Sequence, residues 1–419
     1  MRKTAVDWFN KAQTLLDEDG KYTKRKKAIE YLDKAIKLNP DYAEAYVSRV
    51  DYFALLLQRE SALEDLNKAI CLKPDYAEAY YLRGRLYDSI SFHKHAIEDL
   101  NKAIGLKPDH AEAHYYRGRT KYWLDQHQSA IDDFTEAIRL KPDYADAYIN
   151  RGLEYRSLSQ HEKSIEDYNE AIRLMPDDNY SYYNRGIAYF DLGQYQQAIE
   201  DYTAAIRQKP GDYSLYIHRG EAYDHLGHYQ LAINDYTEAI RLAPKYAHIY
   251  NNRGIVYGKL DQHQKAIKDF NKAFKLNPDN NAILFNNRGF AYVKLGKLQR
   301  AIEDYNEAIR LQPDYDVAYI NRGDAYYELC QLDCAIEDYN EAIRLKPDDA
   351  DAYYDKACCF ALQEKAKQAC KWLRLAIEKG FNDWKHIKKD KDFDNIRKES
   401  CFINLLKEAK NEKTLCYAI

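Results

Sequence analysis

The sequence predicts an all-α fold, a solenoid of stacked antiparallel helix pairs. Three observations point to it: evenly spaced prolines, an alanine that recurs at the same interval, and a glycine that recurs between them. Successive prolines lie 34 residues apart, apart from one interval of 35. They are Pro40, Pro74, Pro108, Pro142, Pro176, Pro210, Pro244, Pro278, Pro313 and Pro347. An interval of this length is typical of a helix pair copied along the chain, in which each copy touches only its neighbours.

The repeat is numbered so that its proline is position 32. Position 8 is glycine in the inner copies from Gly84 to Gly323, position 4 is usually tyrosine, and position 24 is aromatic or leucine. Position 20 is alanine except at Ser164. Position 27 is alanine in every copy, at Ala35, Ala69, Ala103, Ala137, Ala171, Ala205, Ala239, Ala273, Ala308, Ala342 and Ala376. Positions 4, 8 and 11, and positions 20, 24, 27 and 28, follow helical spacing, which predicts two amphipathic helices that face each other.

The ends of the helices and their packing follow from the same positions. A glycine inside a helix costs about 1 kcal/mol relative to alanine, so we expect close approach of the two helices to offset it. The second helix should end before its proline, because the residue before proline avoids the helical conformation. An aspartate such as Asp41, Asp75 or Asp143 usually follows, and we expect it to cap the next helix. Glu44 and Glu78, three residues later, fit a capping box.

A second regularity pairs opposite charges across the two helices. Position 7 is arginine and position 23 is aspartate in the same nine copies. The pairs are Arg49 and Asp65, Arg83 and Asp99, Arg117 and Asp133, Arg151 and Asp167, Arg185 and Asp201, Arg219 and Asp235, Arg253 and Asp269, Arg288 and Asp304, and Arg322 and Asp338. Both residues change together in the end copies, to Lys11 with Tyr31 and Lys356 with Trp372. The pattern predicts an interhelical salt bridge; an arginine row for anionic ligands is the weaker alternative.

This pattern resembles the tetratricopeptide repeat (TPR) family over about residues 5–383, in eleven copies. The resemblance implies a right-handed superhelix whose first helices line a concave channel. We therefore expect eleven tandem repeats in residues 1–383, with atypical first and last copies, and a helical cap in residues 384–419. The first copy has a longer turn between its helices, DEDGKYTKRKK, and the extra residue of the long interval falls near Asn280 and Asn281.

The tail is expected to cover the last helix pair. Trp384, Ile387, Phe393 and Ile396 supply its apolar side chains, followed by a short amphipathic helix with Phe402, Leu405, Leu406 and Ala409. This tail is similar to the C-terminal segments of bacterial and archaeal TPR proteins, which favours a prokaryotic source.

Composition excludes several classes of protein. The formal net charge is −4, from 63 basic and 67 acidic residues, which gives no footprint for nucleic acid. No apolar run reaches about 18 residues, and the N-terminus lacks a signal peptide, so no membrane span or secretion is expected. The eight cysteines lack metal-site spacing and are interpreted as reduced thiols of a cytoplasmic protein. No cofactor, metal site or catalytic group is expected.

The candidate binding face comprises positions 2, 5, 6, 9, 12 and 13 of the first helix, opposite the packed stripe. Position 6 carries a row of polar side chains over six consecutive repeats: Asn150, Asn184, His218, Asn252, Asn287 and Asn321. A carboxamide can donate to and accept from a peptide backbone whatever the peptide side chains. The five asparagines resemble the asparagine row in the TPR domain of O-linked N-acetylglucosamine transferase, which holds extended peptides by their main chain. His218 interrupts the row, and bonding between neighbouring helices is the alternative.

An apolar cluster lies on the same face. It comprises Tyr115, Tyr122, Trp123, Tyr183 and Phe190, with Ile149, Leu153 and Ile187 among them. A solvated face should be polar, so the cluster indicates a docking patch, although adjacent first helices could bury it instead.

The predicted function is a non-catalytic scaffold or adaptor that binds a partner protein or extended peptide in its concave groove. The alternatives are a regulatory sensor that responds to a ligand, and a solenoid that self-associates through its ends.

Overall fold

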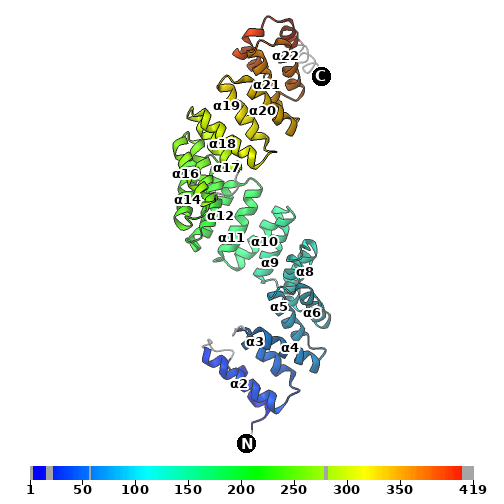
Figure 1. Ribbon diagram of the computed structural model, residues 1–419. Coiled ribbons are helices and arrows are strands. Elements are labelled where there is room, and N and C mark those ends of the chain that lie inside the picture. The colour runs from blue at the N-terminus through cyan, green and yellow to red at the C-terminus, as the bar shows by residue number, and fades with distance from the viewer. Residues whose placement is uncertain (1–2, 16–21, 56–57, 278–281, 408–419) are drawn as a thin grey trace. The chain divides into compact units, whose positions relative to one another are not determined.

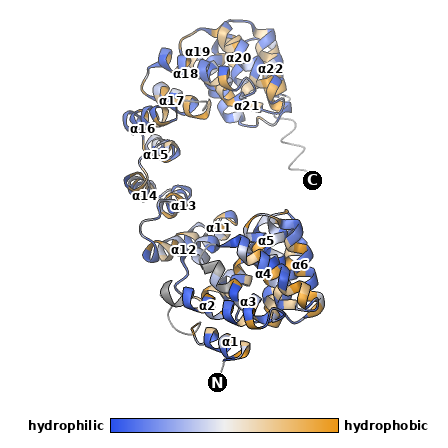
Figure 2. Cartoon of the chain, turned by 60° about the horizontal axis from the view of Figure 1, so that its bottom comes forward, coloured by the Kyte–Doolittle hydropathy of each residue, from blue (hydrophilic) through white to orange (hydrophobic). Residues whose placement is uncertain are grey.

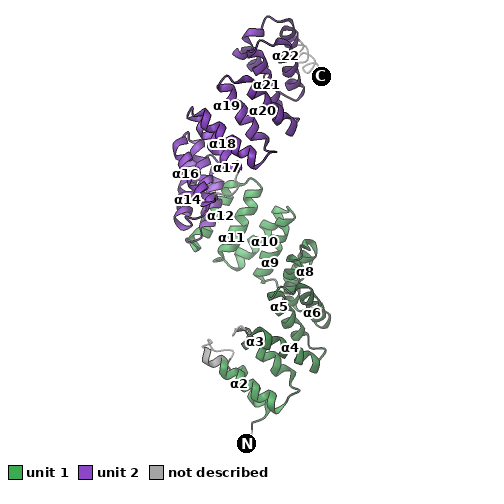
Figure 3. Cartoon of the chain, in the orientation of Figure 1, with its two compact units in different colours: residues 1–210 green, residues 211–419 purple. Residues whose placement is uncertain are grey.

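The chain divides into two compact units, Met1–Pro210 (unit 1) and Gly211–Ile419 (unit 2), as Figure 3 shows. The computed structural model describes residues 3–15, 22–55, 58–277 and 282–407. Every regular element in these ranges is a helix (Figure 1), which confirms the all-α prediction. Among the described residues, no helix has both the length and the apolar composition that a bilayer span requires.

In unit 1, odd-numbered first helices alternate with even-numbered second helices. They are α1 (Ala5–Gln13), α2 (Tyr22–Leu38), α3 (Ala43–Leu55), α4 (Arg59–Leu72), α5 (Ala77–Ser89), α6 (His93–Leu106), α7 (Ala111–Tyr122), α8 (His127–Leu140), α9 (Ala145–Ser157), α10 (His161–Leu174), α11 (Asn179–Asp191) and α12 (Tyr195–Gln208). The two helices of each pair pack against each other, and each pair packs against the next one in the unit.

Unit 2 continues the alternation and then ends in shorter elements. Its helices are α13 (Tyr213–His225), α14 (Tyr229–Leu242), α15 (Ala247–Lys259), α16 (His263–Leu276), α17 (Ala282–Lys294), α18 (Leu298–Leu311), α19 (Asp316–Glu328), α20 (Leu332–Leu345), α21 (Ala350–Leu362), α22 (Ala366–Glu378), α23 (Trp384–Lys389) and the 3-10 helix η1 (Lys391–Ile396). Residues 400–407 are also helical. Each unit is thus a solenoid of helix pairs, as the sequence predicts.

The glycine at position 8 lets the two helices of a pair approach closely. A Cβ atom on Gly289 would lie 2.6 Å from Cε1 of Tyr305, and one on Gly118 would lie 2.9 Å from Cε1 of Phe134. Both rings are fully buried, so they cannot swing aside into solvent. Hydrophobic and hydrophilic residues alternate around the helices (Figure 2), as amphipathic helices require. The predicted close approach of the two helices at the glycine is confirmed.

The predicted salt bridge between positions 7 and 23 is present in every one of the nine copies. In Arg185, Nη2 lies 2.7 Å from Oδ1 of Asp201, and Nε donates to Oδ2 at 2.8 Å, which is a bidentate pair. The other pairs have the same form. Nη1 of Arg185 also donates to Oδ1 of Asn169, at position 25 of the preceding repeat, at 2.6 Å. The arginine therefore joins two repeats, a role that the sequence did not reveal.

In the end copies, lysine over an aromatic ring replaces the salt bridge. Nζ of Lys356 lies 3.2 Å from the ring centroid of Trp372 and donates to Oδ1 of Asn340, again at position 25 of the preceding repeat. Nζ of Lys11 lies 5.6 Å from the ring centroid of Tyr31. A cation is attracted to the face of an aromatic ring, so the terminal pairs keep a cationic contact without a buried carboxylate.

The capping prediction is wrong for most copies. The helix begins one residue later than expected, so the aspartate after proline precedes the N-cap, and at Tyr76 and Tyr144 the N-cap residue supplies no side-chain hydrogen bond. Where aspartate occupies the N-cap itself, it does cap: Asp178 accepts from the backbone N–H of Ser181 at 2.8 Å. The side chain must stand at the N-cap to reach the free N–H groups of the first turn.

From α5 and α6 onward, the described turn inside each pair contains a residue in the left-handed conformation at position 15. Glycine is common in this conformation because it has no Cβ atom. Three copies have glycine there, and the others have a residue with a side chain. The residues are Gly193, Gly227 and Gly296, and Ser91, Asp125, Ser159, Asp261, Cys330 and Glu364. The residues with a side chain adopt this conformation at a cost in free energy, because their Cβ atom crowds the backbone. The tight turn requires the conformation all the same.

Three sequence predictions fall partly or wholly outside the described residues. The longer turn of the first copy is described only from Tyr22 onward, and residues 22–27 belong to α2. The extra residue near Asn280 and Asn281 lies outside the described residues, as does Ala409 of the tail.

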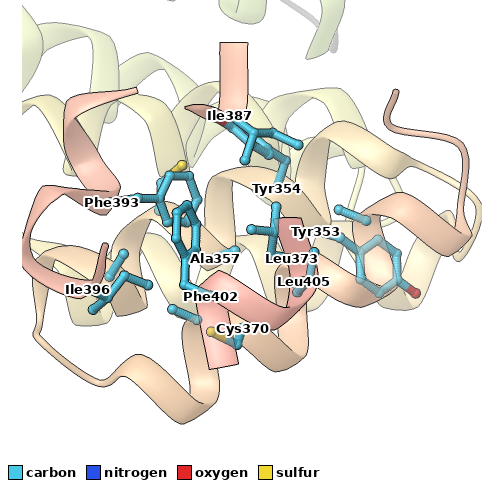
Figure 4. Close-up of a cluster of buried hydrophobic side chains, with 14 residues drawn as sticks. Tyr353, Tyr354, Ala357, Cys370, Leu373, Ile387, Phe393, Ile396, Phe402 and Leu405 are labelled. Atoms are coloured by element: carbon cyan, nitrogen blue, oxygen red, sulfur yellow. The ribbon is translucent and has the colours of Figure 1, made fainter. Parts of the chain in front are cut away.

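The C-terminal segment packs onto α21 and α22 through one apolar cluster (Figure 4). Ile387, Phe393 and Phe402 are buried there against Tyr354 and Leu373. The expected cover of the last helix pair is confirmed for these described side chains.

A disulfide joins Cys370 of α22 to Cys401, with Cα atoms 6.1 Å apart. This separation lies in the usual range for a disulfide. The interpretation of all cysteines as reduced thiols is therefore wrong for these two, because the tail folds back and brings distant residues together.

Candidate functional site

The first helices of successive repeats lie side by side within each unit. In unit 1, α7 contacts α5 and α9, and α9 contacts α11; in unit 2, α17 contacts α15 and α19. We call the surface that they form in each unit the first-helix face. It carries the positions that the sequence singles out for binding.

The asparagines of position 6 in unit 2 link neighbouring first helices. Nδ2 of Asn321 donates to Oδ1 of Asn286 at 2.8 Å, and Nδ2 of Asn287 donates to Oδ1 of Asn251 at 3.4 Å. Asn252 donates to Oε1 of a glutamate in α13 at 3.2 Å. These amides bond neighbouring helices, as the alternative interpretation holds, yet each uses only its nitrogen. Within the described residues their carboxamide oxygens accept no hydrogen bond.

The remaining members of the row bond to the backbone of their own helix. Nδ2 of Asn150 donates to the carbonyl oxygen of Asp146 at 2.7 Å and to the hydroxyl of Tyr115 at 3.2 Å. Nδ2 of Asn184 donates to the preceding turn at 2.8 Å, and its side chain is buried. Nδ1 of His218 lies 2.8 Å from a backbone carbonyl oxygen of α13. The row is therefore held in fixed rotamers by the solenoid itself.

A cavity of about 570 Å³ opens on the first-helix face of unit 2, and we call it the amide cavity. It lies between α15, α17 and α19 and the start of α16. Its lining residues are Gly254, Ile255, Gly258, Lys259, Asp261, His263, Ala266, Phe270, Asn286, Asn287, Phe290, Ala291, Lys294 and Asn321. The amide cavity thus brings together two members of the predicted row and a third carboxamide. This volume is in the range of ligand pockets.

One wall of the amide cavity is apolar and one side is basic. Phe290 is 45% exposed and supplies apolar surface to this wall. Nζ of Lys294 lies 5.1 Å from the centroid of that ring. Lys259 is bound by Asp224, with both carboxylate oxygens 2.8 Å from Nζ. At Gly258 the space is open, with no atom within 4 Å of where a Cβ would stand.

Buried charge accompanies the row in α13. Burial raises the pKa of Glu221, and the nearby Asp224 carboxylate adds to the rise, while His218 and His225 oppose it. The hydrogen bond from Asn252 also favours the charged form of this carboxylate. The site therefore offers amide and carboxylate groups of fixed orientation, and no nucleophile with an activating base among its described residues.

The predicted aromatic cluster is only partly available at the surface. The ring of Tyr115 is 8% exposed and packs on Phe134 and Tyr144, so this residue is largely core. Trp123 is 60% exposed and lies edge-on to Tyr122, with ring centroids 5.1 Å apart. The rings of two further members contact other aromatic rings, at 6.1 Å between centroids for Tyr183 to the buried Tyr202 and 5.2 Å for Phe190 to the half-buried Tyr195.

Several lining residues of the amide cavity escaped the sequence analysis. Ile255 and Phe290 occupy position 9 of consecutive repeats, and their apolar character on a polar face is a signal that could have found them. Gly258 is a glycine outside position 8 of a first helix, and that departure also marks the site. The buried lining from α16 has no comparable signal.

One group of described side chains has the geometry to hold a metal ion. It comprises Cys358, Asp390 and Asp392, whose ligand atoms lie within 4.8 Å of one another. Both carboxylates already accept hydrogen bonds from tyrosine hydroxyls: Tyr354 donates to Asp390 at 2.5 Å, and Tyr327 donates to Asp392. These contacts explain the group as part of the packing of the C-terminal segment.

Helix pairs with this packing define a helical repeat solenoid, and family models give the type of repeat. A model described as TPR repeat matches residues 152–193, 225–261, 289–330 and 323–357. Two models described as tetratricopeptide repeat match residues 180–212 and 247–280, and residues 8–42 and 77–110. The chain belongs to the tetratricopeptide repeat family and has the architecture of a protein-interaction scaffold. No curated protein matches it in sequence.

Solved structures with a similar chain include two proteins described as TPR proteins. A MamA protein is 31% identical over 38% of this chain and 94% of its own, with a TM-score of 0.37. YrrB, described as a TPR protein with an unusual peptide-binding site, is 24% identical over 44% of this chain and 95% of its own, with a TM-score of 0.39. A TPR protein from Parabacteroides merdae is 19% identical over 64% of this chain and 98% of its own, with a TM-score of 0.48.

Proposed function

We propose that the chain is a non-catalytic scaffold that binds an extended segment of a partner protein on its first-helix faces. The amide cavity carries this proposal, because it combines fixed carboxamides with an apolar wall in one accessible space. The oxygens of Asn287 and Asn321 would accept from the partner's backbone N–H groups. An apolar side chain of the partner would pack on Ile255 and Phe290. The balance of charges favours a protein partner over nucleic acid.

The other predicted residues enter the proposal with the roles that their surroundings allow. In unit 2, His218 and Asn252 extend the polar row beyond the amide cavity. In unit 1, Trp123 is the exposed aromatic anchor, a residue type that is frequent at the centre of interfaces. The remaining contacts proposed in unit 1 are Asn150, Asn184, Tyr122, Tyr183, Phe190 and the hydroxyl of Tyr115. A cytoplasmic location stays a prediction.

The test starts from peptides selected by the protein itself. A random peptide library displayed on phage is selected against the full-length chain, and the selected peptides are labelled and titrated by fluorescence anisotropy. Gly258→Phe adds a ring in the open space of the amide cavity. We expect it to weaken binding of the selected peptides by at least about tenfold, and Asn287→Ala with Asn321→Ala to weaken it as well.

The matched control is Gly105→Phe. Gly105 is also a helical glycine with no atom within 4 Å of its missing Cβ, but it lies in α6, away from the first-helix face. Binding by this variant should equal that of the unchanged protein. Equal affinity of Gly258→Phe and Gly105→Phe for every selected peptide would refute the proposed site.

A further inference from the structure

Three side chains of α17 line the amide cavity in a row that changes character from its buried end to its opening. Asn286, Phe290 and Lys294 are spaced by four residues, so they lie on one side of the helix, about 6 Å apart along its axis. Asn286 is 7% exposed, Phe290 is 45% exposed, and Lys294 is exposed as well. The row therefore runs from a buried amide, past an aromatic ring, to a cation at the surface.

The amide at the buried end has an unused donor. Oδ1 of Asn286 accepts from Nδ2 of Asn321 at 2.8 Å. Nδ2 of Asn286 donates to no acceptor among the described residues, although the side chain is buried. Water can serve this N–H group in the free protein, and a ligand that displaces the water loses affinity unless it supplies an acceptor. The buried end of the amide cavity therefore selects against a purely apolar ligand.

Asparagine at this place is not part of the solenoid pattern. Asn286 occupies position 5 of its repeat, where other copies have isoleucine, valine or tyrosine, as at Ile149, Ile217 and Ile320. Asparagine is found at position 5 only here and at Asn251 of the preceding repeat. A residue that the fold requires recurs in most copies, as the arginine of position 7 does. Helix packing therefore does not explain the amide of Asn286.

The middle of the row offers aromatic surface to a ligand. Among the described residues no aromatic ring contacts Phe290, and the only cation near its ring is Nζ of Lys294, 5.1 Å from the centroid. Ile255 of α15 lines the same cavity. An aromatic side chain that packs on such a ring gains contact energy beyond the burial of its apolar area. The wall therefore favours an aromatic side chain over an aliphatic one.

We propose that the amide cavity binds a tyrosine side chain of the partner's extended segment. This inference rests on the proposed function and names the side chain that the cavity selects. The tyrosine ring would pack on Phe290 and Ile255, and its hydroxyl oxygen would accept from Nδ2 of Asn286. Tyrosine combines the aromatic body that the wall favours with an acceptor at its far end. The volume of about 570 Å³ is large enough for this side chain and the backbone beside it.

Other side chains match only part of this chemistry. Phenylalanine has no acceptor for Nδ2 of Asn286, and the indole N–H of tryptophan donates but does not accept. Serine and threonine can accept, but they have no ring to cover Phe290. Phosphotyrosine would bring negative charge to the buried end, whereas both lysines of the lining are exposed. Burying a charge without a paired cation is costly, so the cavity favours the unmodified hydroxyl.

The test starts from the phage-selected peptides whose binding Gly258→Phe weakens. Each tyrosine of such a peptide is replaced in turn by phenylalanine, tryptophan or phosphotyrosine, and the labelled peptides are titrated against the full-length chain by fluorescence anisotropy. We expect each peptide to have one tyrosine at which phenylalanine lowers the affinity at least about tenfold, because the amide N–H loses its acceptor. Tryptophan and phosphotyrosine at the same place should lower it at least as much.

Asn286→Ile tests the same contact from the side of the protein. Isoleucine stands at position 5 in other copies, as at Ile217 and Ile320, so the fold accommodates it. The variant should bind the tyrosine peptide at least about tenfold more weakly and the phenylalanine peptide as well as before, which removes the preference for the hydroxyl. The peptide series uses the unchanged protein, so it decides the question even if Asn286→Ile does not fold.

The matched control is Asn234→Ile. Asn234 is an exposed residue of α14, outside the amide cavity, and its carboxamide accepts from Nε2 of Gln230 on the same helix at 3.1 Å. This variant also replaces one carboxamide by isoleucine. It should keep the full preference for tyrosine over phenylalanine.

Four outcomes would overturn the assignment of tyrosine while peptides still bind in the amide cavity and the proposed function stands. They are selected peptides that lack tyrosine, equal binding of the tyrosine and phenylalanine peptides, tighter binding of the phosphotyrosine peptide, and an unchanged preference in Asn286→Ile. If Gly258→Phe and Gly105→Phe bind every selected peptide alike, or if no peptide is selected, the proposed function fails and this inference fails with it.

Discussion

The contact between position 8 and position 24 predicts how each inner repeat responds to one added methyl group. In a helix, alanine in place of glycine gains up to about 1 kcal/mol from backbone propensity. At Gly289 the new methyl carbon would stand 2.6 Å from Cε1 of Tyr305, whose ring is fully buried. Overpacking of this kind costs about 1–3 kcal/mol. The two effects together predict that Gly289→Ala lowers the free energy of unfolding by up to about 2 kcal/mol.

Two other glycines give the comparison that isolates the contact. At Gly220 the corresponding distance to Cε1 of Tyr236 is 3.1 Å, so Gly220→Ala should be close to neutral. At Gly105 the space is open, and Gly105→Ala should stabilise the protein by up to about 1 kcal/mol. Urea unfolding followed by far-ultraviolet circular dichroism measures all three. If Gly289→Ala were as stable as Gly105→Ala, close packing would not be the reason for glycine at position 8.

Three further predictions concern charge and backbone conformation. Arg185→Leu leaves the carboxylate of Asp201, which is 4% exposed, without its partner and should cost about 3–5 kcal/mol in urea unfolding, while adding Asp201→Asn should recover part of that loss. Burial, followed by the Asp324 carboxylate, raises the pKa of Asp355 from 3.8 to about 8. Between pH 4 and 8 this carboxyl group therefore keeps its proton only in the folded state, so the free energy of unfolding falls as the pH rises. Asp355→Asn should make stability depend less on pH and should raise the free energy of unfolding at pH 7 by roughly 2 kcal/mol. This is less than the full pKa shift implies, because the side chain is partly exposed. An unchanged pH profile would contradict the raised pKa of Asp355. Cys330 has a φ of 57°, so Cys330→Gly should stabilise its repeat by about 0.5–1 kcal/mol, and a lower melting temperature would show that the turn is not strained.

The sequence was most informative where many copies carry the same pair of contacting residues. Glycine against a ring and arginine against aspartate recur often enough that each pattern identified its partner, and both contacts are present. The second bond of the arginine was missed because position 25 varies among asparagine, threonine and aspartate, as at Asn169, Thr135 and Asp33. Any of these side chains offers an oxygen acceptor, so the contact survives without a fixed residue type.

Two kinds of feature were harder to predict: those that depend on the exact residue at which a helix begins, and those that occur in a single copy. The caps failed because the helix begins one residue after the expected position, and only an aspartate such as Asp178 reaches the first turn. The left-handed turn at position 15 was missed because residues such as Glu364 bear no mark of that conformation. The row of position 6 was visible in the sequence, but the amide cavity also needs Phe290 and Gly258, each found in a single repeat.

The arginine of position 7 also has a mechanical consequence. From Arg49 to Arg185 in unit 1, and from Arg253 to Arg322 in unit 2, the arginine is bonded to a carboxylate of its own repeat and to the side chain at position 25 of the preceding repeat, so disorder in one repeat weakens the restraint on its neighbour. The terminal copies, with Lys11 and Lys356 on aromatic rings, lack the bidentate pair. A chain stretched between its two termini should therefore begin to yield at the ends and lose its repeats in a progressive sequence, with force nearly constant as the extension grows.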